Sequence, residues 1–130
     1  RTVPGMVIIN PADDVEARAA VRAAAMYDGP VYLRFGRLPV PVIHSDPDYK
    51  FEIGKGIQLS EGEDVTLVAT GLMVAKALEA VKYLEADGIH AGVIDIHTIK
   101  PLDSEIILKA AGKTGKIVVL EEHSVIGGYL

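Results

Sequence analysis

The apolar positions of the first 35 residues fall into a strand-like run, a helical stretch and a second strand-like run. Residues 6–9 predict a short buried strand, the Ala-rich stretch that follows predicts a helix to about residue 27, and Val31 to Phe35 predict another strand. Asp13 and Glu16 have the spacing of a capping box, which predicts that the helix begins there. We therefore expect a strand–helix–strand unit.

The second half of the chain alternates in the same way. Strands are predicted over residues 65–70, 91–96 and 117–121, and helices over 73–86 and from about 103 to Gly112. In the first of these helices the apolar side chains fall on one face. Strands and helices that alternate with short connections predict an α/β fold with a parallel sheet.

The segment between the two halves has a different composition. Residues 38–50 contain three prolines and two aspartates, which favour an extended connection. We place a domain boundary near residues 44–50 and divide the chain into units 1–44 and 45–130.

Composition narrows the function classes. Of 130 residues, 49% are hydrophobic and 24% charged, which suits one domain, or the end of one domain and a small second one. The net charge of −5 argues against nucleic-acid binding, and no apolar run is long enough for a membrane helix. The absence of cysteine excludes thiolate chemistry and fits a cytoplasmic protein. Because the chain starts without Met and ends abruptly in Gly127-Gly128-Tyr129-Leu130, we expect a fragment of a longer sequence.

Arg34 and Arg37 flank the end of the second predicted strand. Strand carboxyl ends are where open α/β sheets bind ligands, and a guanidinium suits phosphate or carboxylate. On a strand the two side chains would point to opposite faces, so at most one enters a given site. A surface or interface salt bridge remains open for both.

Two other groups of polar residues follow predicted strands. Glu121-Glu122-His123 could serve acid/base chemistry or bind metal, but adjacent residues on one loop favour a hydrogen-bonded loop or a subunit contact. His97, between Ile96 and Thr98, is interpreted as structural, and His44, His90 and His97 show no metal-ligand spacing among themselves. The residues taken alone thus predict an architecture and two arginines of interest, without an activity.

Several segments together resemble the transketolase family, in the family's own order. Three of them resemble the end of its pyrimidine-binding domain: Pro4 to Ile8, Asn10 to Asp13, and Gly29 to Arg34. Three more resemble its C-terminal domain: Asp64 to Gly71, Asp95 to Asp103, and Val119 to Gly128. Phe51 to Gly56 makes the chain most similar to C-terminal subunits of split transketolases, which are encoded as two polypeptides.

The resemblance implies a thiamine diphosphate- and magnesium-dependent enzyme of the pentose phosphate pathway that moves a two-carbon ketol unit between sugar phosphates. It also implies that the cofactor-binding domain lies outside this chain. We therefore expect no cofactor, metal or catalytic residue here, and no activity of the fragment alone. The expected partners are an N-terminal transketolase subunit and further copies in a homo-oligomer, with neither nucleic acid nor membrane. Arg37 matches a family arginine that contacts substrate phosphate, and Arg34 is the alternative.

Two other interpretations stay open. One is a fragment of a deoxyxylulose-phosphate synthase or of the β subunit of a 2-oxoacid dehydrogenase, which share the Pro-Leu-Asp and double-glycine segments. The other is a non-catalytic domain that supports oligomerisation or regulation.

Overall fold

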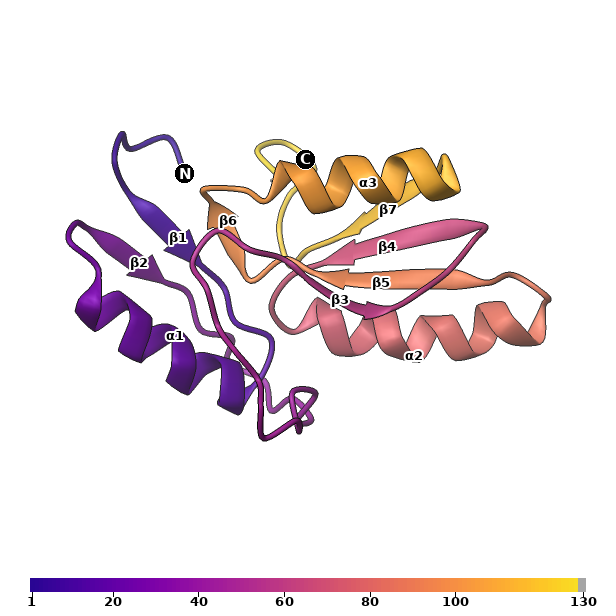
Figure 1. Ribbon diagram of the computed structural model, residues 1–130, viewed down its shortest axis with the longest axis horizontal. Helices are drawn as coiled ribbons and strands as arrows, with labels where there is room; N and C mark the ends of the chain where they lie inside the picture. Colours follow the sequence, from indigo (N-terminus) through magenta and orange to yellow (C-terminus); the bar gives the residue numbers. More distant parts are fainter. Residues whose placement is uncertain (129–130) are drawn as a thin grey trace.

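The chain folds into two small sheets with three helices packed on them (Figure 1). A computed structural model describes residues 1–128. In chain order its elements are β1 (Val7–Ile9), α1 (Asp14–Met26), β2 (Val31–Leu33), β3 (Ile57–Ser60), β4 (Val65–Ala69), α2 (Met73–Ala86), β5 (Ala91–Asp95), β6 (Thr98–Lys100), α3 (Ser104–Thr114) and β7 (Ile117–Leu120).

The first sheet has the strand order β2-β1-β6. β1 and β2 are parallel and joined by α1, as the strand–helix–strand pattern predicts. Asp13 caps α1, because its side chain accepts a hydrogen bond from the Glu16 amide. The buried residues Val7, Ile9 and Ala20 form the small core between this sheet and its helix.

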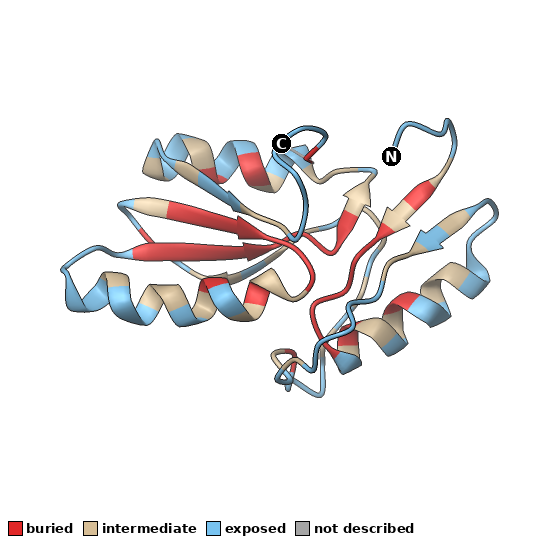
Figure 2. Cartoon of the chain, turned by 180° about the vertical axis from the view of Figure 1, so that it is seen from behind, coloured by how far each residue is buried: buried red, intermediate tan, exposed pale blue. Residues whose placement is uncertain are grey.

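The second sheet has the order β3-β5-β4-β7, with β4 parallel to both β5 and β7. The predicted parallel α/β fold is therefore confirmed. Strand β3 was missed; it pairs antiparallel with β5 and forms one edge. Alternate residues of β4 face opposite helices: Leu67 packs with α2, whereas Val68 packs with α3. Burial therefore reaches both faces of the central strands, as Figure 2 shows.

The end of α3 differs from the prediction. The helix continues through Gly112 to Thr114 and ends at Gly115, whose φ of 65° lies in the left-handed region. Glycine is the residue that adopts this conformation at least cost, so Gly115 is the C-cap. Gly112 is an ordinary helical position, and an added Cβ there meets nothing within 4 Å.

Strand β6 links the two sheets. It follows β5 of the second sheet after two residues, yet it pairs antiparallel with β1 of the first. The backbone amide of Asn10 also donates a hydrogen bond to the His97 carbonyl at 2.8 Å. Residues on both sides of the expected boundary near residue 44 thus share one sheet, and the division into units 1–44 and 45–130 stays a prediction.

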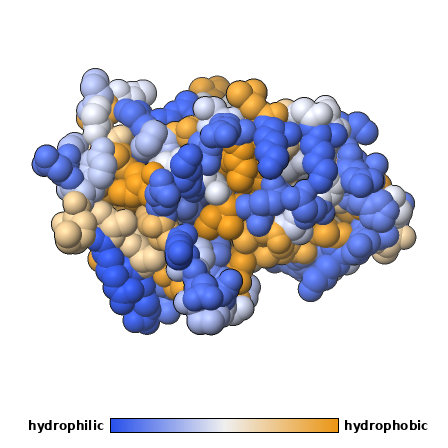
Figure 3. Space-filling view, viewed as in Figure 1, coloured by the Kyte–Doolittle hydropathy of each residue, from blue (hydrophilic) through white to orange (hydrophobic). Residues whose placement is uncertain are grey.

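None of the helices formed by residues 1–128 is long and apolar enough to cross a membrane. The face seen in Figure 3 carries apolar surface between hydrophilic residues.

Candidate functional site

The parallel strands of both sheets direct their carboxyl ends toward the middle of the molecule (Figure 1). Asn10 follows β1 and Thr70 follows β4, and the Asn10 side-chain amide lies 3.3 Å from the Thr70 hydroxyl. Both residues are buried. This contact joins the two sets of strand ends, which is where ligands bind in open α/β sheets.

A pocket of about 440 Å³ lies at these strand ends. Its apolar floor includes Met6, Ile8 and Ile99. Its polar lining comes from Arg1, Asn10, Arg34, Thr70, Glu121 and His123. An apolar pocket with a few convergent polar groups is the usual form of a small-molecule site.

The structure separates the two arginines singled out from the sequence. Arg34 is half-buried in the pocket lining, donates from Nη2 to the Glu122 carbonyl at 2.9 Å and lies 3.5 Å from the Glu122 carboxylate. Arg37 is exposed on the connection after β2 and does not line this pocket. The proposed contact with substrate phosphate stays a prediction for both.

The loop after β7 reaches the same pocket. Glu121 and His123 line it, and Glu122 holds Arg34. The sequence favoured a hydrogen-bonded loop or a subunit contact here. The sequence could not show that Glu122 binds Arg34, because Arg34 lies 88 residues earlier in the chain.

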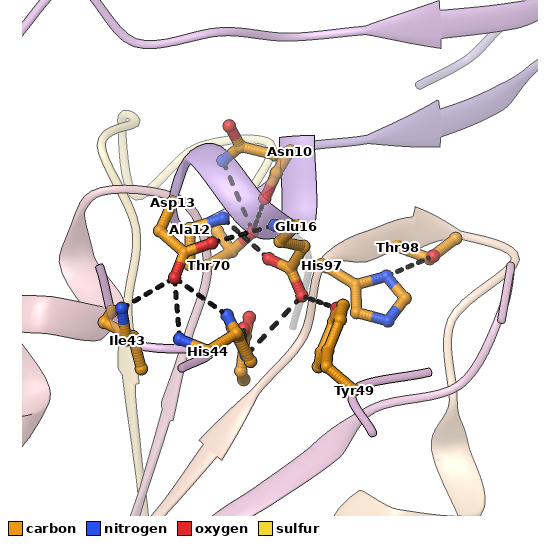
Figure 4. Close-up of polar contacts among 11 residues, drawn as sticks. Asn10, Ala12, Asp13, Glu16, Ile43, His44, Tyr49, Thr70, His97 and Thr98 are labelled. Atoms are coloured by element: carbon orange, nitrogen blue, oxygen red, sulfur yellow. Dashed lines mark hydrogen bonds and ion pairs between the residues drawn. The ribbon is translucent and has the colours of Figure 1, made fainter. Parts of the chain in front are cut away.

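A second polar group lies inside the protein, where α1, the connection after β2 and the end of β5 meet (Figure 4). Asp13 organises it by accepting from the amides of Glu16 at 2.8 Å, Ile43 at 2.6 Å and His44 at 2.7 Å. Burial raises the Asp13 pKa, but these hydrogen bonds outweigh it, and the net pKa is lowered. Asp13 is therefore a carboxylate at neutral pH.

Glu16, His44 and Asp95 face one another in this interior, and their side chains are at most 3% exposed. The His44 Nε2 atom is 3.4 Å from Asp95 Oδ2 and 3.7 Å from Glu16 Oε1. Burial, followed by the nearby Glu16 carboxyl group, raises the Asp95 pKa well above its usual range. Burial also raises the Glu16 pKa, although the hydroxyl of Tyr49 donates to it and opposes this.

The histidines show no metal-ligand spacing along the chain, but for His44 that conclusion is incomplete. His44, Glu16 and Asp95 each offer a ligand atom, and these atoms lie within 4.8 Å of one another. Sequence spacing cannot reveal such a group, because its members come from a helix, a connection and a strand.

His97 has different surroundings. Its buried ring stacks on Phe51 with ring centroids 4.2 Å apart, and its Nδ1 atom forms a hydrogen bond with the Thr98 hydroxyl. Burial lowers the His97 pKa to about 4, so the ring is neutral, in keeping with a structural role.

Comparison with known proteins agrees with this fold. Residues 54–129, more than half of the chain, match the family model described as "Transketolase, C-terminal domain". The chain belongs to the transketolase family. This family is of the transferase type, and the resemblance seen in the sequence is confirmed.

Relatives of this transketolase-family chain include subunits of split enzymes. It is 48% identical over 128 residues to the 6-deoxy-6-sulfo-D-fructose transketolase subunit SqwH of a Clostridium species, covering 98% of this chain and 39% of that protein. It is 44% identical over 128 residues to a subunit of the apulose-4-phosphate transketolase of Phocaeicola vulgatus, covering 98% and 41%. The transketolase-family chain thus spans about two fifths of the length of these relatives.

A solved structure, described as an inactive β4 tetramer of a split-gene transketolase, superimposes with a TM-score of 0.95 at 53% identity, covering 99% of this chain and 43% of that one. The transketolase-family chain is also 42% identical over 130 residues to the 1-deoxy-D-xylulose-5-phosphate synthase of Heliobacterium modesticaldum, covering 99% of this chain and 20% of that protein. The relatives therefore include both transketolases and deoxyxylulose-phosphate synthases, two of the enzyme types considered from the sequence.

Replacing Asp13 by alanine should destabilise the transketolase-family chain by about 2–4 kcal/mol. The substitution removes the cap of α1 and leaves the amides of Ile43 and His44 without their charged acceptor. The matched control is Asp103→Ala. Asp103 also caps a helix, but it accepts from two amides, at 2.9 and 3.3 Å, and is only partly buried. We expect about 1 kcal/mol for the control. Urea denaturation measures both, and equal losses would contradict the special role of Asp13.

Proposed function

We propose that this chain is the C-terminal part of a transketolase that transfers a two-carbon ketol unit between sugar phosphates. The observation that carries the proposal is the likeness to split-transketolase subunits over nearly the whole chain. In this proposal the active enzyme forms with an N-terminal transketolase subunit or domain and assembles as an oligomer.

Thiamine diphosphate and magnesium are the proposed cofactors of the complete enzyme, and the residues of this chain do not fit them. The group of potential metal ligands found within residues 1–128 is enclosed, with side chains at most 3% exposed, and leaves no approach for a diphosphate. Magnesium is usually bound by one or two carboxylates together with phosphate oxygens and waters, so a site with no room for the diphosphate does not suit it. The cofactor would supply the electron sink for the carbanion, and the partner would hold it.

The contribution of this chain is then to bind and orient the sugar phosphate. The pocket at the strand ends has an apolar floor and carries the half-buried Arg34. Among residues 1–128 the hydrogen bond of Arg34 uses Nη2, so its other donors can take a phosphate oxygen. Arg37, which matches the family arginine and lies on the exposed connection that leaves β2, remains the first candidate for this contact, and Arg34 is the alternative.

A deoxyxylulose-phosphate synthase is the second candidate function, because one such enzyme is 42% identical over the same 130 residues. The two reactions differ in their two-carbon donor, which is a ketose phosphate for a transketolase and pyruvate for the synthase. A non-catalytic oligomerisation domain is the alternative outside catalysis.

We expect that the chain alone shows neither ketol transfer nor thiamine diphosphate binding, because it spans about two fifths of its subunit relatives. Both should be seen when the full-length subunit that contains this chain is mixed with an N-terminal transketolase subunit. Calorimetric titration with cofactor and magnesium, before and after mixing, measures binding. A coupled assay with a ketose phosphate, or with pyruvate and glyceraldehyde 3-phosphate, separates the two enzyme types. Stoichiometric cofactor binding to the chain alone would contradict the proposal, and so would a mixed complex that is inactive in both assays.

In the complete enzyme, Arg37→Ala should lower kcat/KM for phosphorylated sugars by roughly ten- to a hundredfold, because a charged hydrogen bond to phosphate is lost. Arg37→Lys should rescue only part of this, since a point charge cannot reproduce the planar fork. Arg34→Ala is assayed beside it and identifies the arginine that makes the contact.

Arg22→Ala, on the exposed outer face of α1, is the matched control and should leave kinetics unchanged. Non-phosphorylated acceptors should be nearly unaffected by every variant. Equal losses on phosphorylated and non-phosphorylated acceptors, with the oligomer weakened in light scattering, would instead make the arginine an interface residue.

A further inference from the structure

Three buried polar side chains from separate segments face one another, and within residues 1–128 no lysine or arginine forms an ion pair with them. Glu16 comes from α1, His44 from the connection after β2, and Asp95 from the end of β5. Neither Asp95 oxygen nor His44 Nε2 has a hydrogen-bond donor among the described residues. Acceptors packed together in the interior repel one another unless a proton or a cation lies between them.

Asp13 determines which nitrogen of His44 points into this group. The Asp13 carboxylate is 3.2 Å from His44 Nδ1, and it can only accept, so Nδ1 carries the hydrogen. In the neutral ring Nε2 then keeps its lone pair, which faces Glu16 and Asp95. A carboxylate that holds the far nitrogen of an imidazole is the usual support of a metal-ligating histidine.

The two carboxylates are prepared differently. Glu16 is held in place, because Tyr49 donates to one of its oxygens and the Ala12 amide to the other, both at 2.7 Å. Asp95 has both oxygens available and can bind an ion through one or two of them. Two carboxylates and a neutral imidazole balance the charge of a divalent cation.

We propose that Glu16, His44 and Asp95 form a buried structural site for a divalent transition metal ion of the zinc type. The ion would tie α1 and the connection after β2 to the second sheet. A mixed nitrogen and oxygen ligand set suits zinc, whereas magnesium prefers oxygen ligands. Tetrahedral zinc separates its nitrogen and oxygen ligands by about 3.3–3.5 Å. The His44 distances of 3.4 and 3.7 Å therefore need only a small contraction.

A shared proton is the competing occupant. If Glu16 and Asp95 hold one proton between them, the repulsion is relieved without an ion. A protein with a metal site binds zinc and is stabilised by it, whereas a protein with a shared proton does neither. The metal content and the thermal midpoint therefore distinguish the two occupants.

The test uses the complete subunit, stripped with a chelator and titrated with zinc chloride in a calorimeter. We expect one equivalent per chain and a raised thermal midpoint, with no rise on adding magnesium chloride. Cobalt(II) should occupy the same site and give the intense visible absorption of a tetrahedral ion.

Four variants locate the bound ion. Asp95→Asn and His44→Gln should lose the zinc equivalent and the cobalt absorption. Asp13→Asn keeps all three ligands but loses the support of His44, so zinc affinity should fall roughly 10- to 100-fold. His90→Gln changes an exposed histidine and is the matched control, which should bind zinc as the wild type does.

Two results would overturn the proposal. If the wild type binds no zinc and its thermal midpoint does not respond, the group holds a shared proton. If Asp95→Asn and His44→Gln keep the zinc equivalent, the ion binds adventitiously at the surface. The wild-type titration and cobalt spectrum decide even if a variant does not fold.

Discussion

The buried carboxylate of Asp13 is the interaction on which the arrangement of the rest depends. It caps α1 through the Glu16 amide and, with its other oxygen, holds the amides of Ile43 and His44. Hydrogen bonds to an ionised acceptor are about twice as strong as neutral ones, and their desolvated donors would otherwise be left without a partner. The proline-containing connection is therefore fixed to the beginning of α1, although no regular secondary structure holds it.

The connection that Asp13 holds also contacts the second sheet. It delivers His44 to Glu16 and Asp95, and it leads the chain to β3 at the edge of the second sheet. The second sheet in turn returns β6 to pair with β1. Together these contacts set the carboxyl ends of β1 and β4 against each other, which forms the pocket that holds Arg34. The proposed binding function thus depends on the contact between the two sheets, because neither sheet forms the pocket alone.

Local sequence patterns were enough to predict most helices and strands, but not the tertiary contacts between them. The alternation of apolar runs and helical spacings predicted β1, α1, β2, β4, α2, β5, α3 and β7 close to their observed bounds. The capping-box spacing predicted the cap of α1, yet it did not reveal that Glu16 is wholly buried and meets Asp95, 79 residues later. The three-residue strand β6 lacks a periodic signal of its own, because pairing with β1 creates it. Arg34 was recognised as a strand-end arginine, but its partner Glu122 depends on the tertiary fold.

Native-state hydrogen exchange measured on the intact protein tests the central claim, that Asp13 makes the connection after β2 part of the cooperative unit formed by the two sheets. The amides of Ile43 and His44 lie in a connection without secondary structure, so their protection reports on Asp13 alone. These two amides are expected to open with the same free energy as the amides of Val68 and Ile94 in the central strands. Fast exchange of Ile43 and His44, as in an open loop, while the central strands stay protected, would contradict it.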